Sequence, residues 1–250
     1  YSIAEIAEAT GAVVAGNADG LFISNILIDS RQLTFGAQTL FFAIKTDRND
    51  GHRYIPQLLA EGVKAFVVSS LYQEPENARG CVFLKVADQV AALQQLARYH
   101  RRKFQIPVVG ITGSNGKTIV KEWLVQLLSP FQRVASSPKS YNSQLGVPLS
   151  IWTLNPVNTL AVFEAGISMP GEMEKLEPMI LPDIGIITNI GNAHAANFSS
   201  IDEKLSEKLK LFANCHTIIY CLDHHTIHQL ITTTEPYRSK KLVTWGTGEE

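Results

Sequence analysis

The segment Ile106–Thr118 constrains the fold of this chain more than any other stretch. It reads IPVVGITGSNGKT, an apolar run with the β-branched residues of a buried strand followed by a glycine-rich turn. Apolar residues at helical spacing then continue at Val120, Trp123, Leu124, Leu127 and Leu128. A strand, a glycine turn and a helix in this order predict a phosphate-binding loop at the end of a strand in an α/β sheet.

Each residue type in the turn suits a polyphosphate. Gly113 and Gly116 lack a Cβ, so the backbone can curve around a phosphate and direct N–H groups towards it. The Lys117 ammonium can reach the β- and γ-phosphates, and the Thr118 hydroxyl can ligate Mg²⁺. Ile111 occupies the first glycine position of the pattern G-x-x-x-x-G-K-[ST], so a purely structural turn is the alternative. The predicted ATP-binding residues are Gly113, Ser114, Asn115, Gly116, Lys117 and Thr118.

Composition and charge restrict the remaining function classes. The 250 residues are 45% hydrophobic, enough to bury the core of one large domain or two ordinary ones. Lysine and arginine number 22 against 23 aspartates and glutamates, which predicts no nucleic-acid partner and no membrane-surface binding. No apolar run approaches the roughly 20 residues of a membrane span and no targeting pattern opens the chain, so we expect a cytoplasmic protein. Three cysteines without a C-x-x-C pair, Cys81, Cys215 and Cys221, predict buried, reduced thiols.

Residues 1–86 alternate the patterns of strands and helices and predict a small α/β domain. Ser2 and Glu5 form a capping box that opens a short helix through Ala9, and Gly11 ends this helix. The other predicted elements are strands at Asn25–Asp29 and Thr39–Ile44, a helix at Tyr54–Ala60, and strands at Ala65–Val68 and Val82–Val86.

Residues 87–250 predict a doubly wound, mostly parallel sheet. Asp88 is expected to cap a helix that ends at the basic cluster His100–Lys103, before the strand that leads into the glycine turn. Apolar strands then alternate with helical patterns, as in βαβ units. The predicted strands are Thr159–Phe163, Ile184–Thr188, Thr217–Tyr220 and Lys241–Trp245, and the predicted helices are Gly171–Ile180, Asp202–Phe212 and His225–Ile231.

Polar residues follow two of these strands directly. Glu164 comes after the strand Thr159–Phe163, and the segment Asn189–His194 comes after the strand Ile184–Thr188. Ligands of open parallel sheets bind outside the carboxyl ends of the strands. We therefore expect Glu164 and the segment Asn189–His194 to lie on the side of the sheet that holds the glycine turn.

Four sequence blocks carry a resemblance to a known family. They are GITGSNGKT at 110–118, YNSQLGVPLS at 141–150, FEAGISMPGEMEKL at 163–176 and ITNIGNAHAANFSSIDEKLSEKLKLF at 187–212. Together with the tripeptide DSR at Asp29–Arg31, this set resembles the ATP-dependent Mur ligases of peptidoglycan synthesis. The resemblance covers nearly the whole chain. It implies an amino-terminal UDP-binding domain, residues 1–86, and a central ATP-binding domain, residues 87–250, that is incomplete at its carboxyl end.

The resemblance is strongest for the branch of the family that joins D-Ala-D-Ala to a UDP-N-acetylmuramoyl-tripeptide. In the implied reaction, ATP phosphorylates the free carboxylate of the tripeptide. The dipeptide amine then attacks the acyl phosphate, which yields an amide, ADP and phosphate. The implied cofactors are ATP and two Mg²⁺ ions, because neutralisation of charge and alignment supply most of the catalysis of phosphoryl transfer.

The resemblance also implies roles for individual residues. Thr118 and Glu164 would hold the first Mg²⁺, and His194 and Lys208 would hold the second. Lys208 would act as a carbamate, because the adduct with CO₂ turns a cation into an anionic oxygen ligand that suits a hard metal. The implied catalytic residues are Lys117, Asn142, His194 and Lys208.

An ordinary structural interpretation of Lys208 stays open. Lys204, Lys208 and Lys210 form a run of charge on one predicted helix, which is typical of a solvated helix face.

For the amino-terminal region, the resemblance implies UDP binding by Ser30, Arg31 and Lys45. The planar guanidinium of an arginine suits a diphosphate because it donates hydrogen bonds in pairs. A surface ion pair between Arg31 and Asp29 is the alternative.

Other functions are compatible with these motifs, and part of the family's sequence is missing from these residues. Ligases that add a single amino acid, folylpolyglutamate synthetase and a non-catalytic nucleotide-binding module are the rival interpretations. The G-x-H-N-x-x-N-A helix and the carboxy-terminal domain of the family are not present in these residues. We therefore expect a fragment that binds nucleotide weakly and gives negligible turnover without that domain in cis. Some relatives carry a fused alanine racemase domain, on which these residues carry no information.

Overall fold

The structure is a computed structural model that describes residues 1–76, 78–191 and 197–248. The chain forms two compact units, Tyr1–Tyr99 and His100–Glu250, and each is described by itself. The division falls inside helix α3, Gln89–Arg101, whereas the sequence analysis set the domain boundary between residues 86 and 87. None of the helices in the described ranges is long and apolar enough to cross a bilayer.

The first unit is built on a five-stranded sheet with the order β1-β5-β4-β3-β2. Strand β1 is antiparallel to β5, and the other neighbours are parallel. Its elements are α1 Ile3–Thr10, β1 Val13–Gly16, β2 Asn25–Leu27, η1 Ser30–Gln32, β3 Thr39–Phe42, η2 Gly51–Tyr54, α2 Ile55–Ala60, β4 Ala65–Ser69 and β5 Val82–Val86. The predicted elements are confirmed, and β1, η1 and η2 are additions to them.

Local sequence explains the ends of helices in this unit. The Ser2 hydroxyl accepts from the Glu5 amide, the Glu5 carboxylate accepts from the Ser2 amide, and Gly11 ends α1 in the left-handed conformation. The core of the sheet includes an aromatic stack, because the rings of Phe66 and Phe83 lie 5.4 Å apart.

The second unit contains a six-stranded sheet with the order β11-β10-β9-β6-β8-β7, in which all neighbouring strands are parallel. The predicted doubly wound sheet is confirmed. The strands are β6 Val108–Thr112, β7 Val134–Ser136, β8 Leu160–Glu164, β9 Ile184–Ile187, β10 Thr217–Cys221 and β11 Lys241–Trp245. The helices are α4 Lys117–Leu128, α5 Gly146–Ile151, α6 Met173–Ile180, α7 Ile201–Leu209, η4 Lys210–Phe212, α8 His225–Thr233 and η5 Tyr237–Ser239.

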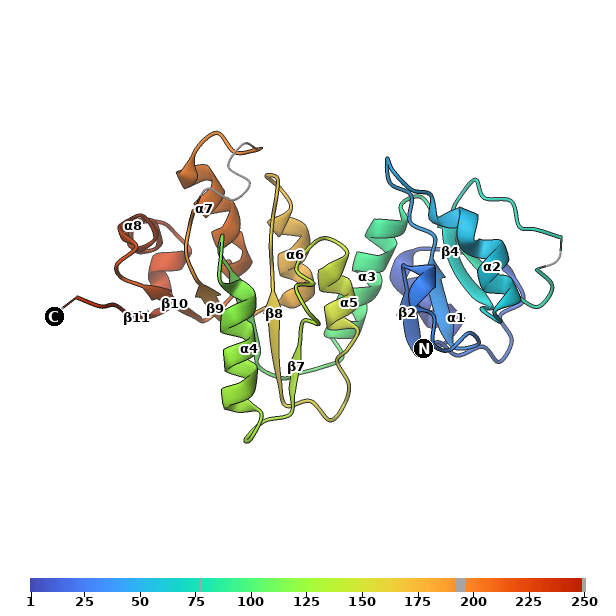
Figure 1. Cartoon of the computed structure of the whole chain (residues 1–250), viewed down its shortest axis with the longest axis horizontal. Helices are drawn as coiled ribbons and strands as arrows, with labels where there is room; N and C mark the ends of the chain where they lie inside the picture. The colour runs from blue at the N-terminus through green and yellow to red at the C-terminus, as the bar shows by residue number, and fades with distance from the viewer. Residues whose placement is uncertain (77, 192–196, 249–250) are drawn as a thin grey trace. The chain divides into compact units, whose positions relative to one another are not determined.

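The two faces of this sheet are covered differently. On one face, Val120 and Leu124 of α4 pack against Val109, Ile111 and Val162, and Figure 1 shows α4 lying alongside β8. The opposite face contacts η4. A Cβ at Gly185 would lie 2.3 Å from the ring of Phe212, so only glycine allows this close approach.

The face that carries α4 continues over strands with less cover. Ile184 and Ile186 of β9 flank the α4 cluster and are only partly buried. Ile219 of β10, the register partner of Ile186, is also partly buried, and its partner on β11, Val243, is 39% exposed. Parallel sheets normally bury both faces. Among the described residues, this part of the sheet is therefore incompletely covered.

Cysteine chemistry follows the expectation from composition. Cys81, Cys215 and Cys221 are all free and buried. Burial raises the pKa of the Cys215 thiol, which makes the reactive thiolate scarcer.

Candidate functional site

The turn between β6 and α4 has the backbone that a phosphate loop requires. Gly113 has a φ of +138°, and a Cβ there would lie 2.0 Å from Thr188 Oγ1. Gly116 has a φ of +80° and forms the N-cap of α4 without a side-chain capping bond. The first-turn amides of α4 therefore have no side-chain cap, and the positive end of the helix favours an anion.

Residues that follow β9 hold this loop in place. The Ser114 amide donates to the Asn189 carbonyl at 2.9 Å, and the Asn115 amide donates to Asn189 Oδ1 at 3.0 Å. The Thr188 hydroxyl donates to the Asn115 carbonyl at 2.6 Å. The Gly191 amide donates to Ser114 Oγ at 2.9 Å. The expectation that the segment after β9 lies on the side of the glycine turn is confirmed for its described part.

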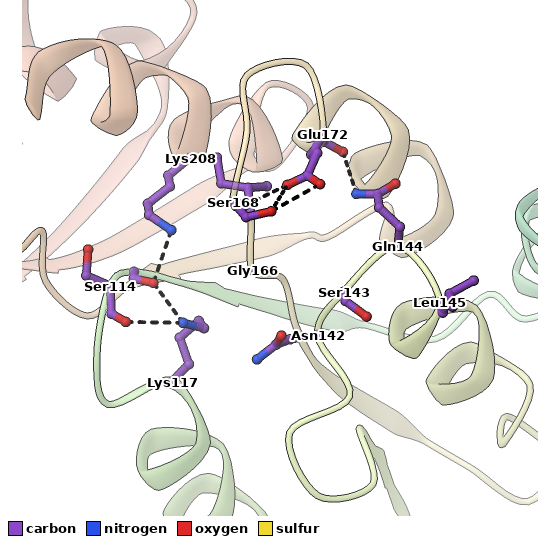
Figure 2. Close-up of a pocket in the computed structure, with 12 residues that line it drawn as sticks. Ser114, Lys117, Asn142, Ser143, Gln144, Leu145, Gly166, Ser168, Glu172 and Lys208 are labelled. Carbon is purple, nitrogen blue, oxygen red and sulfur yellow. Dashed lines mark hydrogen bonds between the residues drawn. The ribbon is translucent and has the colours of Figure 1, made fainter. Parts of the chain in front are cut away.

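Two lysines from different helices converge on one carbonyl of the loop. Lys117 Nζ donates to the Gly113 carbonyl at 2.8 Å, and Lys208 Nζ donates to the same oxygen at 3.2 Å. Figure 2 shows both side chains pointing towards the turn from opposite sides. Burial lowers the pKa of Lys117. Because the Lys117 ammonium lies against the loop, it would be close to the phosphates of a bound triphosphate.

Lys208 is not part of a solvated helix face. It is 2% exposed, and Lys204, one turn earlier on α7, is 1% exposed and donates to the Gly191 carbonyl. Burial, together with the positive charges of Lys117 and Lys204, lowers the pKa of Lys208 to about 7. Lys210 fits the solvated interpretation, because it pairs with Glu174 and Glu207 near the surface.

Glu164 is the last residue of β8 and is fully buried. Its Oε2 accepts from the Thr118 hydroxyl at 3.0 Å and from Asn142 Nδ2 at 3.3 Å. Its Oε1 makes no hydrogen bond, although Lys121 Nζ lies 3.2 Å away as an ion-pair partner. Glu164 was expected just after the strand, and the strand extends by this one residue.

The arrangement of Thr118 and Glu164 fits an Mg²⁺ ion. Neighbouring oxygens of an octahedral Mg²⁺ site with bonds of about 2.1 Å lie about 3 Å apart. Thr118 Oγ1 and Glu164 Oε2 have this separation, and the carboxylate is a hard ligand at the positive end of α4. His194, which was predicted to hold the second ion, lies outside the described residues.

A cavity of about 500 Å³ opens beside the loop. Gly113 is among the residues that line it. Figure 2 shows Ser114 and Lys117 on one side of the cavity and Asn142 and Lys208 on others. The cavity gathers residues from the turn, from the segment after β7 and from α7. The described residues that were predicted for catalysis, Lys117, Asn142 and Lys208, therefore line one space.

Several residues at this site were missed by the sequence analysis. Lys121 is fully buried against Glu164, and a signal for it existed, because Lys121 lies one helical turn after Lys117. Gln144 and Glu172 line the same cavity, and Gln144 Nε2 donates to the Glu172 carbonyl at 3.1 Å. Glu172 Oε2 accepts from the Ser168 amide at 2.6 Å, which fixes the turn before α6.

The predicted substrate residues of the first unit only partly come together. Ser30 and Arg31 line a second cavity of about 380 Å³, together with Asn49 and Tyr54, whereas Lys45 is exposed outside this lining. The Arg31 side chain is 86% exposed and pairs with Asp29 at 2.8 Å. This pair lowers the pKa of Asp29 to about 2. The ion pair named as the alternative is therefore present, and the cavity beside it leaves room for a ligand.

A glycine turn ahead of a helix on a parallel sheet, with a buried acid on the adjacent strand, defines a P-loop nucleotide-binding domain. The sequence profile of the Mur ligase middle domain matches residues 111–250, and the profile described as Mur ligase family, catalytic domain, matches residues 22–101. The first match alone spans more than half of the chain. The chain therefore belongs to the Mur ligase family.

Similar proteins point to one branch of this family. A UDP-N-acetylmuramoyl-tripeptide--D-alanyl-D-alanine ligase from Synechocystis is 33% identical over 233 residues, which are 93% of this chain and 50% of that protein. The enzyme of the same description from Bacillus subtilis is 33% identical over 190 residues, 76% of this chain and 40% of its own.

Solved structures agree with this assignment of the fold. A MurF crystal structure from Acinetobacter baumannii superposes with a TM-score of 0.86 and 27% identity, covering 99% of this chain and 54% of that one. MurF from Thermotoga maritima in complex with ADP superposes with a TM-score of 0.77 and 27% identity, covering 92% and 52%. The chain thus spans about half the length of the relatives it matches.

Proposed function

We propose that this chain is the UDP-substrate- and ATP-binding part of a ligase that joins D-Ala-D-Ala to UDP-N-acetylmuramoyl-tripeptide. The observation that carries the proposal is the convergence of the P-loop, the pair of Thr118 and Glu164, and Lys208 around one cavity. The names of the similar proteins support the choice of substrates. In this reaction the γ-phosphoryl group passes to the tripeptide carboxylate, and the dipeptide amine then displaces phosphate from the carbonyl carbon.

In the second unit, positively charged groups would bind the phosphates, and oxygen ligands would bind Mg²⁺. The amides at the start of α4 and the Lys117 ammonium would hold and orient the phosphates. Thr118 and Glu164 would hold Mg²⁺, which supplies charge neutralisation at the transferred phosphoryl group. Asn142 donates to the Glu164 carboxylate and lines the cavity, so its amide can position the carboxylate that is to be phosphorylated.

We also propose that Lys208 is carbamylated in the active protein. CO₂ reacts with a neutral amine, and a pKa of about 7 leaves much of Lys208 neutral at physiological pH, unlike an ordinary lysine. The adduct would place an anionic oxygen ligand beside the loop, where two other lysines favour negative charge. His194 would contribute to the same second metal position.

The carbamate has a direct test. Native mass spectrometry of the protein under labelled CO₂ should reveal a labile adduct of one CO₂, which Lys208→Ala abolishes. Lys210→Ala is the matched control, because Lys210 lies near the surface with a raised pKa and should leave the adduct intact. If wild-type protein carries no adduct and Lys208→Ala binds ATP and Mg²⁺ unchanged, a non-catalytic nucleotide-binding module becomes the better interpretation.

In the first unit we propose that the cavity next to Ser30 and Arg31 receives the UDP group. The Arg31 guanidinium is exposed and already oriented by Asp29, so it could turn its free donors to a diphosphate. Lys45 would add charge near the mouth of the site. Because ATP and UDP-linked precursors are substrates, the cytoplasmic location belongs to the same proposal.

Further polypeptide in cis is also part of this proposal. The similar proteins are about twice as long, and the partly exposed residues Ile184, Ile186 and Ile219 need cover in a parallel sheet. A domain that covers this face and completes the ATP and dipeptide sites would account for both observations.

The substrate assignment can be tested by phosphate release. The full-length protein is incubated with ATP, Mg²⁺ and UDP-N-acetylmuramoyl-tripeptide, with D-Ala-D-Ala or with single amino acids. We expect release that depends on D-Ala-D-Ala. Release that depends only on a single amino acid would move the protein to a sister ligase, and release driven by a folate and glutamate would favour a folylpolyglutamate synthetase.

A further inference from the structure

Lys121 is a fully buried cation that ties together three segments of the second unit. Its ammonium donates to the carbonyls of Ser137 at 2.7 Å and Lys139 at 2.5 Å, both in the stretch after β7. It also pairs with Glu164 Oε1, at the end of β8, at 3.2 Å. The fourth partner is Glu122 Oε1 at 3.0 Å, on a side chain that is 53% exposed.

Burying a lysine in this position costs free energy that packing alone does not require. An ammonium loses its hydration on burial, and an aliphatic side chain of similar length would fill the same space without that loss. Two N–H donors of Lys121 are directed instead at backbone carbonyls, and its charge is paired with the Glu164 and Glu122 carboxylates. The buried ammonium therefore fixes the positions of these carbonyl and carboxylate oxygens.

The acceptors belong to Glu164, which contacts Thr118 of the P-loop, and to the stretch of chain that leads to Asn142. With Oε1 of Glu164 directed at Lys121, Oε2 is left to Thr118 and Asn142. Lys139 has a φ of +50°, an uncommon conformation for a residue with a Cβ, and its carbonyl accepts from the Lys121 ammonium. Lys121 thus holds both the carboxylate and the segment that leads to Asn142.

We propose that Lys121 is a positioning residue that couples the Mg²⁺ end of the P-loop to the segment 137–142, which carries Asn142. This inference rests on the proposed function, since it takes Thr118 and Glu164 as the residues that hold Mg²⁺. Binding of the ion to Glu164 Oε2 is then transmitted through Lys121 to the backbone of the segment, and Asn142 is ordered when the metal and nucleotide are bound.

Hydrogen exchange read by mass spectrometry tests the coupling locally. The chain is compared with ADP alone and with ADP and Mg²⁺. In wild-type protein we expect Mg²⁺ to slow exchange in both the P-loop, 113–118, and the segment 137–142, by about tenfold in the latter. In Lys121→Met, which keeps an apolar stem of similar length, Mg²⁺ should still slow exchange in the P-loop but leave 137–142 unchanged.

Glu122→Gln is the matched control. It removes the solvent-side partner of the same ammonium, keeps the contacts with Glu164 and the two carbonyls, and should behave as wild type. Lys121→Met with a wild-type response to Mg²⁺ in 137–142 would overturn the inference. If Mg²⁺ slows exchange in the P-loop of wild-type protein but not in the segment 137–142, the inference is also overturned. The proposed nucleotide site would then still stand. A wild-type P-loop that does not respond to ADP and Mg²⁺ would instead refute the proposed nucleotide site, and this inference with it.

A second measurement needs no variant and covers the case in which Lys121→Met does not fold. Lysine acetylation of wild-type protein is mapped with and without ADP and Mg²⁺. Lys139, whose side chain is exposed, should react in both states, and Lys121 should react in neither. Labelling of Lys121 to the extent of Lys139 in the presence of ADP and Mg²⁺ would show that the ammonium leaves Glu164, which contradicts a positioning role.

Discussion

At the scale of single residues, buried lysines distinguish the nucleotide site. Lys117 and Lys208 share the Gly113 carbonyl, and Lys204 holds the Gly191 carbonyl next to them. Burial, together with the nearby charges of Lys117 and Lys204, lowers the pKa of Lys208, which supports the proposed reaction of its amine with CO₂. In the proposed function these cations would bind a polyphosphate, and their burial is a cost in stability.

The pKa of Lys208 makes that cost measurable. Its value is about 7 in the folded chain against 10.5 for a free lysine. At a pH above 10.5, Lys208 is neutral in both the folded and the unfolded chain, so its burial costs no free energy of ionisation. As the pH falls towards 7 the unfolded chain gains a proton that the folded chain lacks, and below 7 the cost is constant. We expect Lys208→Met to raise the free energy of unfolding by on the order of a few kcal/mol near pH 7, and by less at higher pH.

Urea unfolding between about pH 7 and pH 9 in CO₂-free buffer measures this effect. Lys210→Met is the comparison, since ion pairs with Glu174 and Glu207 raise the pKa of Lys210 and its removal should not stabilise the fold. A Lys208→Met variant less stable than wild type at pH 7 would show that the ammonium is not desolvated as the structure indicates.

Thr118 supplies a second prediction at this scale. Its hydroxyl lies against Glu164 Oε2, so Thr118→Val should remove one Mg²⁺ ligand while keeping the shape of the side chain. We expect the gain in ADP affinity on adding Mg²⁺ to fall by about tenfold, measured by calorimetry with and without EDTA. Thr118→Ser keeps the hydroxyl and should retain the gain. Equal Mg²⁺ dependence in Thr118→Val and wild type would remove this residue from the metal site.

At the scale of elements, segments with a clear local pattern were predictable, and segments that depend on contacts with other elements were not. The bounds of β5 and β11 coincide with the prediction, because apolar strands between turn residues carry a clear local signal. The strand β7 has only three residues, and α5 contains glycine and proline, which locally indicate a turn. Contacts with β8 and α6 make these segments regular, and such contacts leave no periodic trace in so short a sequence.

The P-loop turn gives a prediction for an element. Gly113→Ala would drive a Cβ to 2.0 Å from Thr188 Oγ1 at a φ of +138°, whereas Gly116→Ala meets open space at a φ of +80°. We expect losses in unfolding free energy of about 2–4 kcal/mol for Gly113→Ala and about 1 kcal/mol for Gly116→Ala. Urea denaturation compares the two, and equal losses would mean that the Thr188 contact is relaxed in solution.

At the scale of the whole molecule, the described residues combine a candidate nucleotide site with one part of a sheet that they cover incompletely. Ile186, Ile219 and Val243 follow one another across β9, β10 and β11 on the face that α4 covers elsewhere. The relatives extend to about twice the length of this chain. Both observations support the proposal that further polypeptide in cis covers this face.

We therefore expect the 250-residue chain by itself to bind ADP weakly and to give negligible ligase turnover. Calorimetry with ADP and Mg²⁺, and phosphate release with both peptide substrates, measure the two properties. Robust amide formation by these residues alone would contradict the expectation and would show that no further domain is needed.

The sequence by itself determined the local chemistry and the class of fold. The glycine turn, the lysine and threonine that close it, and the acid after a buried strand were all identifiable, because each depends on spacing within one or two elements. A parallel α/β sheet followed from the alternation of strands and helices.

Only the tertiary structure decided which charges are buried. Lys204 and Lys208 lie next to Leu205 and Leu209 on α7, so the spacing of the leucines placed them near the core, but a solvated face was equally compatible with the run of charge. Lys121 likewise gained its role from a carboxylate 43 positions away on β8. Burial, pairing and the pKa of a lysine depend on segments distant in sequence, because desolvation and Coulomb interactions act through space.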